Sequence, residues 1–131
     1  MFLDASAVIG YLAEEEDYLT IAKKLASADQ VLFSPLAHYE ACVGLTRAKR
    51  GNLEDAETTV LKLLQTTSAH IIPMTPEIGF EAMKAHARFG KGRHKASLNM
   101  GDCFAYACAK VHRVKILCKG NDFIHTDIEL A

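Results

Sequence analysis

Four acidic residues stand in apolar surroundings where a solvated surface carboxylate is not expected. They are Asp4, Glu40, Asp102 and Asp122. The first follows an apolar N-terminal stretch, the second is the only acid of an apolar helical segment, and the last two adjoin apolar runs further along the chain. Burying several carboxylates together is costly unless a cation compensates for their charge. We therefore expect these four side chains to meet around a cation.

A divalent metal ion is the economical partner for this charge. No Lys or Arg adjoins Asp4, Glu40 or Asp102 in the sequence. Oxygen ligands suit Mg²⁺ or Mn²⁺, which keep bound waters for a phosphate substrate. Zinc is disfavoured because no Cys and His cluster has zinc-ligand spacing, and His38 with Cys42 is better interpreted as a packed or solvated pair.

A carboxylate-held divalent ion suits phosphodiester hydrolysis. Such an ion lowers the pKa of an attacking water and stabilises the charge that develops on phosphate. One ion, or two that divide these tasks, would serve. A small phosphatase with an Asp nucleophile is a poorer interpretation, because Asp4 is followed by Ala-Ser rather than by a second acid two residues on.

A basic segment without acids precedes Asp102. It contains Lys84, His86, Arg88, Lys91, Arg93, His94 and Lys95. Such a segment would suit a phosphate backbone, although an ordinary solvated face explains it equally well. The candidate nucleic-acid contacts are Arg88, Lys91, Arg93 and Lys95.

Strand and helix patterns alternate along the chain, and they are the elements that must position the acids. Strands are predicted at residues 1–4, 30–33, 70–74 and 114–118, and helices at residues 6–15, 17–28, 35–50, 52–67, 76–89 and 102–113. This alternation favours a parallel sheet covered by helices on both faces. Sites in such sheets gather beyond the carboxyl ends of the strands.

The four acids are expected at that edge of the sheet. Asp4 and Asp122 follow predicted strand ends, while Glu40 and Asp102 are placed in the first turns of helices. The helix from Asp102 is the organising element, because residues 103–109 are all apolar or aromatic and a helix apolar all round is buried. A mere helix cap is the competing interpretation of Asp102.

Composition sets the remaining limits. With 131 residues, half of them apolar, the chain is expected to form one domain spanning residues 1–131. A net charge of −1 selects no partner, so any nucleic-acid affinity must be local. Met1 leads directly into a predicted strand, and no apolar run is long enough to cross a bilayer. Four unpaired cysteines favour a reducing cytoplasm.

The chain resembles the PIN-domain ribonucleases, specifically the VapC-type toxins of bacterial toxin–antitoxin pairs. The resemblance lies in FLDASAV at the start, YEA around Glu40, FGKGRHKASLNMGDCFAYACAK, and ILCKGNDFIHTDI near the end. It covers essentially the whole chain. It implies a three-layer α/β/α fold with a short, mainly parallel central sheet, and a cytoplasmic endoribonuclease that uses Mg²⁺ or Mn²⁺.

The resemblance also assigns roles to residues. It makes Asp4, Glu40, Asp102 and Asp122 catalytic, with Asp4 and Asp102 as metal ligands and Ser6 and Asn121 as supporting residues. Relatives often carry two acids where this chain has Asn121 and Asp122.

The partners implied by the resemblance are an RNA substrate, a second copy of the chain in a homodimer, and a small antitoxin that blocks the site. An alternative role is chiefly that of a binding partner for a DNA-binding antitoxin in an autorepressing complex. In the family, loop shape rather than a readable motif is expected to select the RNA.

Overall fold

A computed structural model describes all of residues 1–131 and contains a short, fully parallel sheet. Its strands are β1 (Phe2–Leu3), β2 (Leu32–Phe33), β3 (His70–Ile71) and β4 (Ile116–Leu117), in the order β3-β2-β1-β4. Every predicted strand is present, but each is shorter than predicted. The two central strands are fully buried, as expected for a sheet covered on both faces.

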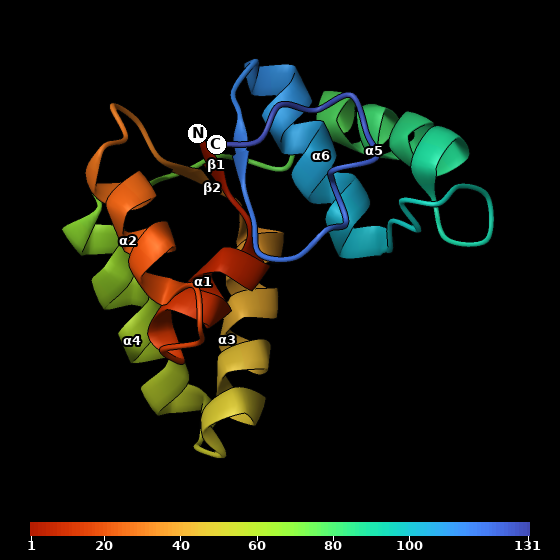
Figure 1. Ribbon diagram of the computed structural model, residues 1–131. Helices are drawn as coiled ribbons and strands as arrows, with labels where there is room; N and C mark the ends of the chain where they lie inside the picture. Colours follow the sequence, from red (N-terminus) through yellow and green to blue (C-terminus); the bar gives the residue numbers. More distant parts are fainter.

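Six helices cover the sheet. They are α1 (Ala5–Leu12), α2 (Tyr18–Ala26), α3 (Pro35–Lys49), α4 (Leu53–Thr66), α5 (Pro76–Phe89) and α6 (Met100–His112). Figure 1 shows α1 to α4 grouped on one side of the strands and α5 with α6 on the other. The predicted three-layer α/β/α class is therefore confirmed. None of the helices combines the length and the apolar character that crossing a bilayer requires.

Helix α6 is the buried element that the sequence predicts, but it begins earlier than Asp102. Asn99 is its N-cap: Asn99 Oδ1 accepts the Asp102 N–H at 3.0 Å, and Asp102 Oδ2 accepts the Asn99 N–H at 2.8 Å. This reciprocal pair is a capping box, and it makes Asp102 the third residue of the helix instead of its opening residue. Residues 105–109 are all buried.

Helix α3 begins as predicted, with Ser34 as its N-cap and Pro35 in its first position. Ser34 Oγ accepts the Ala37 N–H at 3.1 Å. Because the helix begins at Pro35, Glu40 is its sixth residue. It therefore lies in the second turn, and the prediction of a first-turn position is wrong.

The chain after β4 has no long regular element, yet it is anchored at several points. Phe123 is only 2% exposed. Further along, the Ile116 N–H donates to the Glu129 carbonyl, and the Ala131 N–H donates to the Ile116 carbonyl, both at 2.9 Å. We call residues 118–131 the C-terminal segment. It carries Asp122 past the end of the sheet and then returns beside β4.

Candidate active site

Asp4 connects β1 to α1 and is almost fully buried. Its side chain is 6% exposed, and it caps α1 by accepting the Ser6 N–H at 2.9 Å on Oδ2. The Ser6 hydroxyl donates to the same oxygen and accepts the Lys119 N–H at 2.9 Å. Ser6 thus links the end of β4 to Asp4. Both hydrogen bonds use Oδ2, which leaves Oδ1 for another partner.

Asp102 enters the same region from α6. Burial raises its pKa to about 6, the hydrogen bond from Asn99 opposes this rise, and the negative charges of Asp4 and Asp122 add to it. One oxygen of Asp102 is used in the capping box, so it is at once a helix-capping residue and a member of the acidic group.

Glu40 reaches the region from the second turn of α3. Its pKa is raised to about 7, chiefly by burial and in addition by the charges of Asp4 and Asp102. Its carboxylate lies against Gly101: a β-carbon on residue 101 would come within 2.7 Å of Glu40 Cδ and closer still to Oε1. The absence of a side chain at Gly101 makes room for this carboxylate.

The structure brings all four predicted acids together, and we call Asp4, Glu40, Asp102 and Asp122 the carboxylate site. Asp122 is exposed, but its charge raises the pKa of both Asp4 and Asp102. No Lys or Arg lowers the pKa of the three other acids. The charge of the site is therefore uncompensated by protein cations.

The carboxylate site fits a hard divalent ion that keeps most of its waters. As the side chains stand, no three Asp, Glu, His or Cys residues are grouped closely enough to hold a metal ion. Mg²⁺ commonly takes only one or two carboxylates and completes its shell with water and substrate phosphate. The buried Asp4 and the half-buried Asp102, which repel one another, suit that arrangement. His38 instead contacts Glu57 at 3.3 Å, with Cys42 Sγ at 3.7 Å.

The predicted supporting residue Asn121 and the predicted RNA-binding residues lie on different segments of the chain. Asn121 is exposed next to Asp122, and its carbonyl accepts the Ile124 N–H at 3.3 Å. Lys91, Arg93 and Lys95 are exposed on the loop that runs from α5 into Asn99.

Arg88 lies apart from that loop. Both of its terminal nitrogens donate to Asp127 at 3.3 Å, and its guanidinium stacks on Phe89. Its charge is therefore engaged within the protein.

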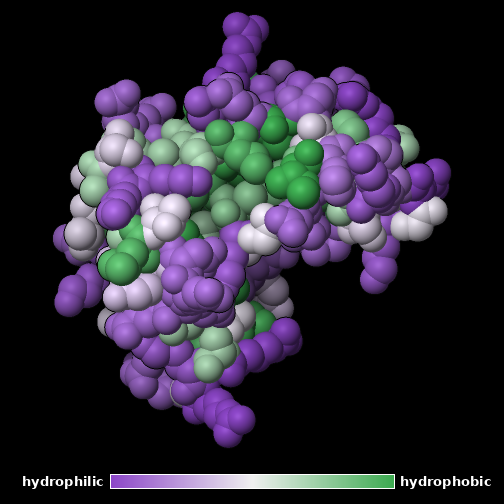
Figure 2. Space-filling view, viewed as in Figure 1, coloured by the Kyte–Doolittle hydropathy of each residue, from purple (hydrophilic) through white to green (hydrophobic).

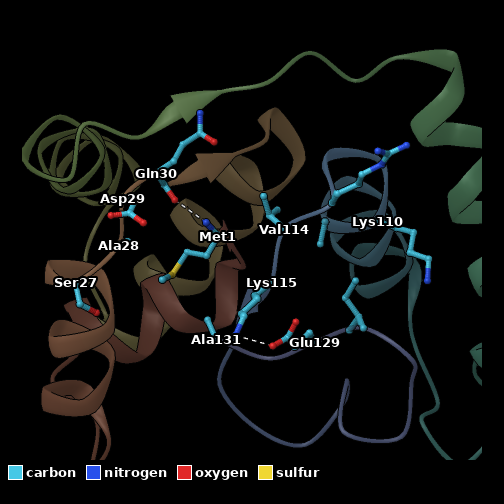
Figure 3. A pocket seen from close by; sticks show the side chains of 13 residues that line it. Met1, Ser27, Ala28, Asp29, Gln30, Lys110, Val114, Lys115, Glu129 and Ala131 are labelled. Carbon is cyan, nitrogen blue, oxygen red and sulfur yellow. Dashed lines mark hydrogen bonds and ion pairs between the residues drawn. The ribbon is translucent and has the colours of Figure 1, made fainter.

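A large hollow of the molecule lies elsewhere. It has a volume of about 880 Å³ and is lined by residues that precede the strands, including Met1, Gln30 and Lys115 (Figure 3). These are the amino ends of the strands, opposite the carboxylate site. A separate notch is visible in Figure 2 between the α1–α4 group and the α5–α6 group.

The sequence analysis did not predict two features that lie near the carboxylate site or on the elements that carry it. Gly101 is one, because only the fold reveals that it faces Glu40. The other is the pair formed by Tyr106 and Asp127, whose side chains are 2.5 Å apart. A signal for this pair was available, since a tyrosine hydroxyl within an apolar helix requires a hydrogen-bond partner.

Comparison with known proteins identifies the family. A family model described as PIN domain matches residues 1–129. A VapC ribonuclease of Rhizobium meliloti is 37% identical, with 97% of this chain and 98% of that protein aligned. Ribonuclease VapC28 of Mycobacterium tuberculosis is 35% identical over 100% of this chain and 97% of that protein.

Solved structures share the fold. The VapC20 toxin of Mycobacterium tuberculosis, described as cleaving the sarcin–ricin loop, has a TM-score of 0.78 and 16% identity over 99% of this chain and 97% of that chain. A toxin–antitoxin complex from Klebsiella pneumoniae gives a TM-score of 0.72 and 18% identity over 99% and 95% of the two chains. With the family-model match and the curated relatives, this establishes that the chain belongs to the PIN-domain family, among the VapC ribonucleases.

Proposed function

We propose that this protein is a metal-dependent endoribonuclease that acts in the cytoplasm as the toxin of a toxin–antitoxin pair. The observation that carries the proposal is the carboxylate site, whose buried Asp4 and half-buried Glu40 and Asp102 have no protein cation that lowers their pKa. The names of the curated relatives, which are VapC ribonucleases at 35–37% identity, support RNA as the substrate.

Asp4 and Asp102 are the residues we assign to hold Mg²⁺ or Mn²⁺. In each, one oxygen is occupied by a hydrogen bond, from Ser6 to Asp4 and from Asn99 to Asp102. These bonds fix the carboxylate planes and leave the second oxygen of each for an ion. A bound ion would lower the pKa of an attacking water and stabilise charge on the phosphate.

Glu40 and Asp122 complete the proposed chemistry. Glu40, whose pKa is raised to about 7, is suited to accept a proton from the attacking water near neutral pH. Asp122, which lies in the C-terminal segment, would help to orient that water. Ser6 acts through Asp4, and Asn121 supports the turn that carries Asp122.

The exposed loop after α5 is the proposed contact for the RNA backbone. Lys91, Arg93 and Lys95 stand within eleven residues of Asp102 in the sequence, and the loop leads directly into the N-cap of α6. Phosphates held there would place a neighbouring phosphodiester near the carboxylate site. Arg88 contributes less in this proposal, because Asp127 already binds its guanidinium.

We further propose two protein partners. A small antitoxin would cover the carboxylate site and supply the positive charge that it lacks. A second copy of the chain would form a homodimer through apolar side chains on α5 and at the start of α6. Phe80, Met83 and Met100 are each more than 60% exposed there, and exposed apolar groups of this size mark interaction surfaces.

The test is to induce the protein in cells, map the cleaved 5′ ends in total RNA, and repeat the mapping with the Asp102→Asn variant. The purified proteins are then assayed on the mapped RNA with Mn²⁺ and with EDTA. Discrete ends that require both Asp102 and the metal support the proposal. Identical ends for the variant overturn it and favour a protein that chiefly binds a DNA-binding antitoxin.

A further inference from the structure

A buried tyrosine and an exposed aspartate connect α6 to the C-terminal segment. Tyr106 is 1% exposed, and its hydroxyl donates to Asp127 Oδ1 at 2.5 Å. The other oxygen, Oδ2, receives Arg88 at 3.3 Å and Lys110 at 3.2 Å. Three donors from two helices thus converge on one carboxylate. None of these four residues belongs to the carboxylate site.

The placement of this contact relates it to the carboxylate site. Tyr106 follows Asp102 by four residues in α6, so the two side chains project from neighbouring turns of one helix face. Asp127 follows Asp122 by five residues in the C-terminal segment. The Tyr106–Asp127 hydrogen bond therefore joins the same two elements that carry Asp102 and Asp122.

Neither partner of the Tyr106–Asp127 hydrogen bond changes its protonation state near neutral pH. Burial acts to raise the pKa of Asp127, but the hydrogen bonds from Tyr106 and Lys110, with the charges of Lys110 and Arg88, hold it at about 2. Burial and Asp127 together raise the pKa of the Tyr106 hydroxyl, so it remains a donor. The hydrogen bond is consequently not a pH switch.

The repulsion within the carboxylate site explains why such a connection is needed. Asp122 raises the pKa of Asp4 and Asp102, so their charges repel one another and favour movement of the segment away from the site. Asp122 itself is exposed and lies outside any helix or strand. Restraint must come from its neighbours: Lys119, whose N–H is bound by Ser6, Phe123, which is buried in the core, and Asp127.

We propose that Tyr106 and Asp127 are positioning residues, which hold the C-terminal segment so that Asp122 faces Asp102 and which thereby set the affinity of the carboxylate site for a divalent ion. This inference rests on the proposed function, since it takes the carboxylate site to be a metal site. Neither residue contacts the ion or the substrate.

The decisive variant is Tyr106→Phe, which removes only the hydroxyl and leaves Asp127 paired with Arg88 and Lys110. We expect Mn²⁺ binding, measured by calorimetry on the metal-free protein, to weaken by about fivefold, the scale of the net contribution of one typical hydrogen bond. The rate of RNA cleavage should recover at saturating Mn²⁺, because the positioning loss is offset by excess ion. The KM for RNA should not change.

A matched control exists in the same segment. Lys115 and Glu129 form an exposed ion pair of 2.6 Å where the segment returns beside β4, each seven residues from Asp122 in the sequence. The Glu129→Gln variant removes this pair and should leave the Mn²⁺ affinity unchanged. Asp127→Asn, which keeps an oxygen to accept the hydrogen bond from the tyrosine hydroxyl but loses the charge, should weaken Mn²⁺ binding by less than an Asp127→Ala change.

The outcomes separate this inference from the proposed function. Unchanged Mn²⁺ affinity in Tyr106→Phe, or an equal loss in Glu129→Gln, overturns the positioning role while leaving the ribonuclease intact. Weaker Mn²⁺ binding in a protein that cuts no RNA supports the positioning role and overturns the ribonuclease. A wild-type protein that binds no Mn²⁺ overturns both.

Discussion

The carboxylate of Glu40 packs directly on Gly101, the residue that precedes Asp102. Any side chain at residue 101 would overlap Glu40 Oε1, and its β-carbon would lie within 2.7 Å of Glu40 Cδ and Oε2. This contact brings an acid of α3 against the first turn of α6. It joins two helices from opposite groups at the carboxylate site, and it depends on the absence of a side chain at residue 101.

Replacing Gly101 with Ala should displace the Glu40 carboxylate. Because the obstructing atoms are the far end of a flexible side chain, we expect a modest loss of stability of about 1 kcal/mol and at least a tenfold loss of RNA cleavage. Thermal unfolding and single-turnover cleavage would measure the two effects.

The control for Gly101 is Gly79 in α5, where an added β-carbon meets no atom within 4 Å. Gly79→Ala should stabilise the protein by about 0.5–1 kcal/mol and leave cleavage unaffected. Full activity of Gly101→Ala would contradict the placement of Glu40.

Asp102→Asn should abolish metal-dependent cleavage without unfolding the protein. The amide keeps an oxygen that can accept the Asn99 N–H, so the cap of α6 survives while one of the repelling charges is removed. In EDTA the variant should melt no lower than the wild type. Asp102→Ala, which also loses the cap, should melt lower, because removing such a cap costs about 1 kcal/mol. Wild-type cleavage by Asp102→Asn would exclude this residue from the site.

The metal-free protein should lose stability as the pH rises from about 5 to 8. The pKa of Glu40 lies at about 7 in the folded protein against an ordinary value of 4.5, and that of Asp102 at about 6 against 3.8. The folded state binds these protons more tightly than the unfolded chain. Their contribution is therefore complete below the ordinary values and is lost as the pH passes the raised ones.

Glu40→Gln provides the check on this pH dependence. At pH 8 the variant should be more stable than the wild type by about 1 kcal/mol, or about 4 °C, a value reduced for the partial exposure of the carboxyl. Its melting temperature should vary less between pH 5 and 8. Mn²⁺ should reduce the same variation in the wild type. A wild-type melting temperature that rises with pH in EDTA would contradict the raised pKa values.

The basic loop should contribute to the salt dependence of RNA binding. Replacing Arg93 and Lys95 with Ala should reduce the slope of log K against log salt by about 1.4, taking about 0.7 for each phosphate contact to a single strand. Arg88→Ala should change this slope less, because Arg88 is bound to Asp127. Filter binding between 50 and 200 mM salt, with each change made in the Asp102→Asn protein, would measure the slopes of the parent, the double variant and Arg88→Ala. An unchanged slope in the double variant would assign Arg93 and Lys95 to an ordinary solvated face.

Local signals in the sequence were sufficient for most of the framework. The Ser34-Pro35 pair specified the start of α3, and the apolar run after Asp102 specified a buried helix, because caps and hydrophobic patterns act over a few residues. The alternation of strands and helices predicted the parallel sheet for the same reason. Glu40 was placed one turn too early, although the start of its helix was correctly identified.

Contacts between distant segments were beyond the reach of such signals. The sequence analysis began α6 at Asp102, whereas in the structure Asn99 is its N-cap. Arg88 was grouped with the basic loop because charge patterns record no partner 39 residues away, and the structure pairs it with Asp127. The closeness of Glu40 to Gly101 depends on how α3 packs beside α6, which no local pattern specifies.

The acids of the carboxylate site stand on parts of the chain that differ in local stability against opening. Asp102 stands on α6, which is mostly buried, so we expect the amide hydrogens of this helix to be among the last to exchange with solvent. Asp122 stands on a stretch without a helix or strand, where opening requires far less free energy. Warming should therefore abolish RNA cleavage below the melting temperature of the protein, and this inactivation should be reversible on cooling.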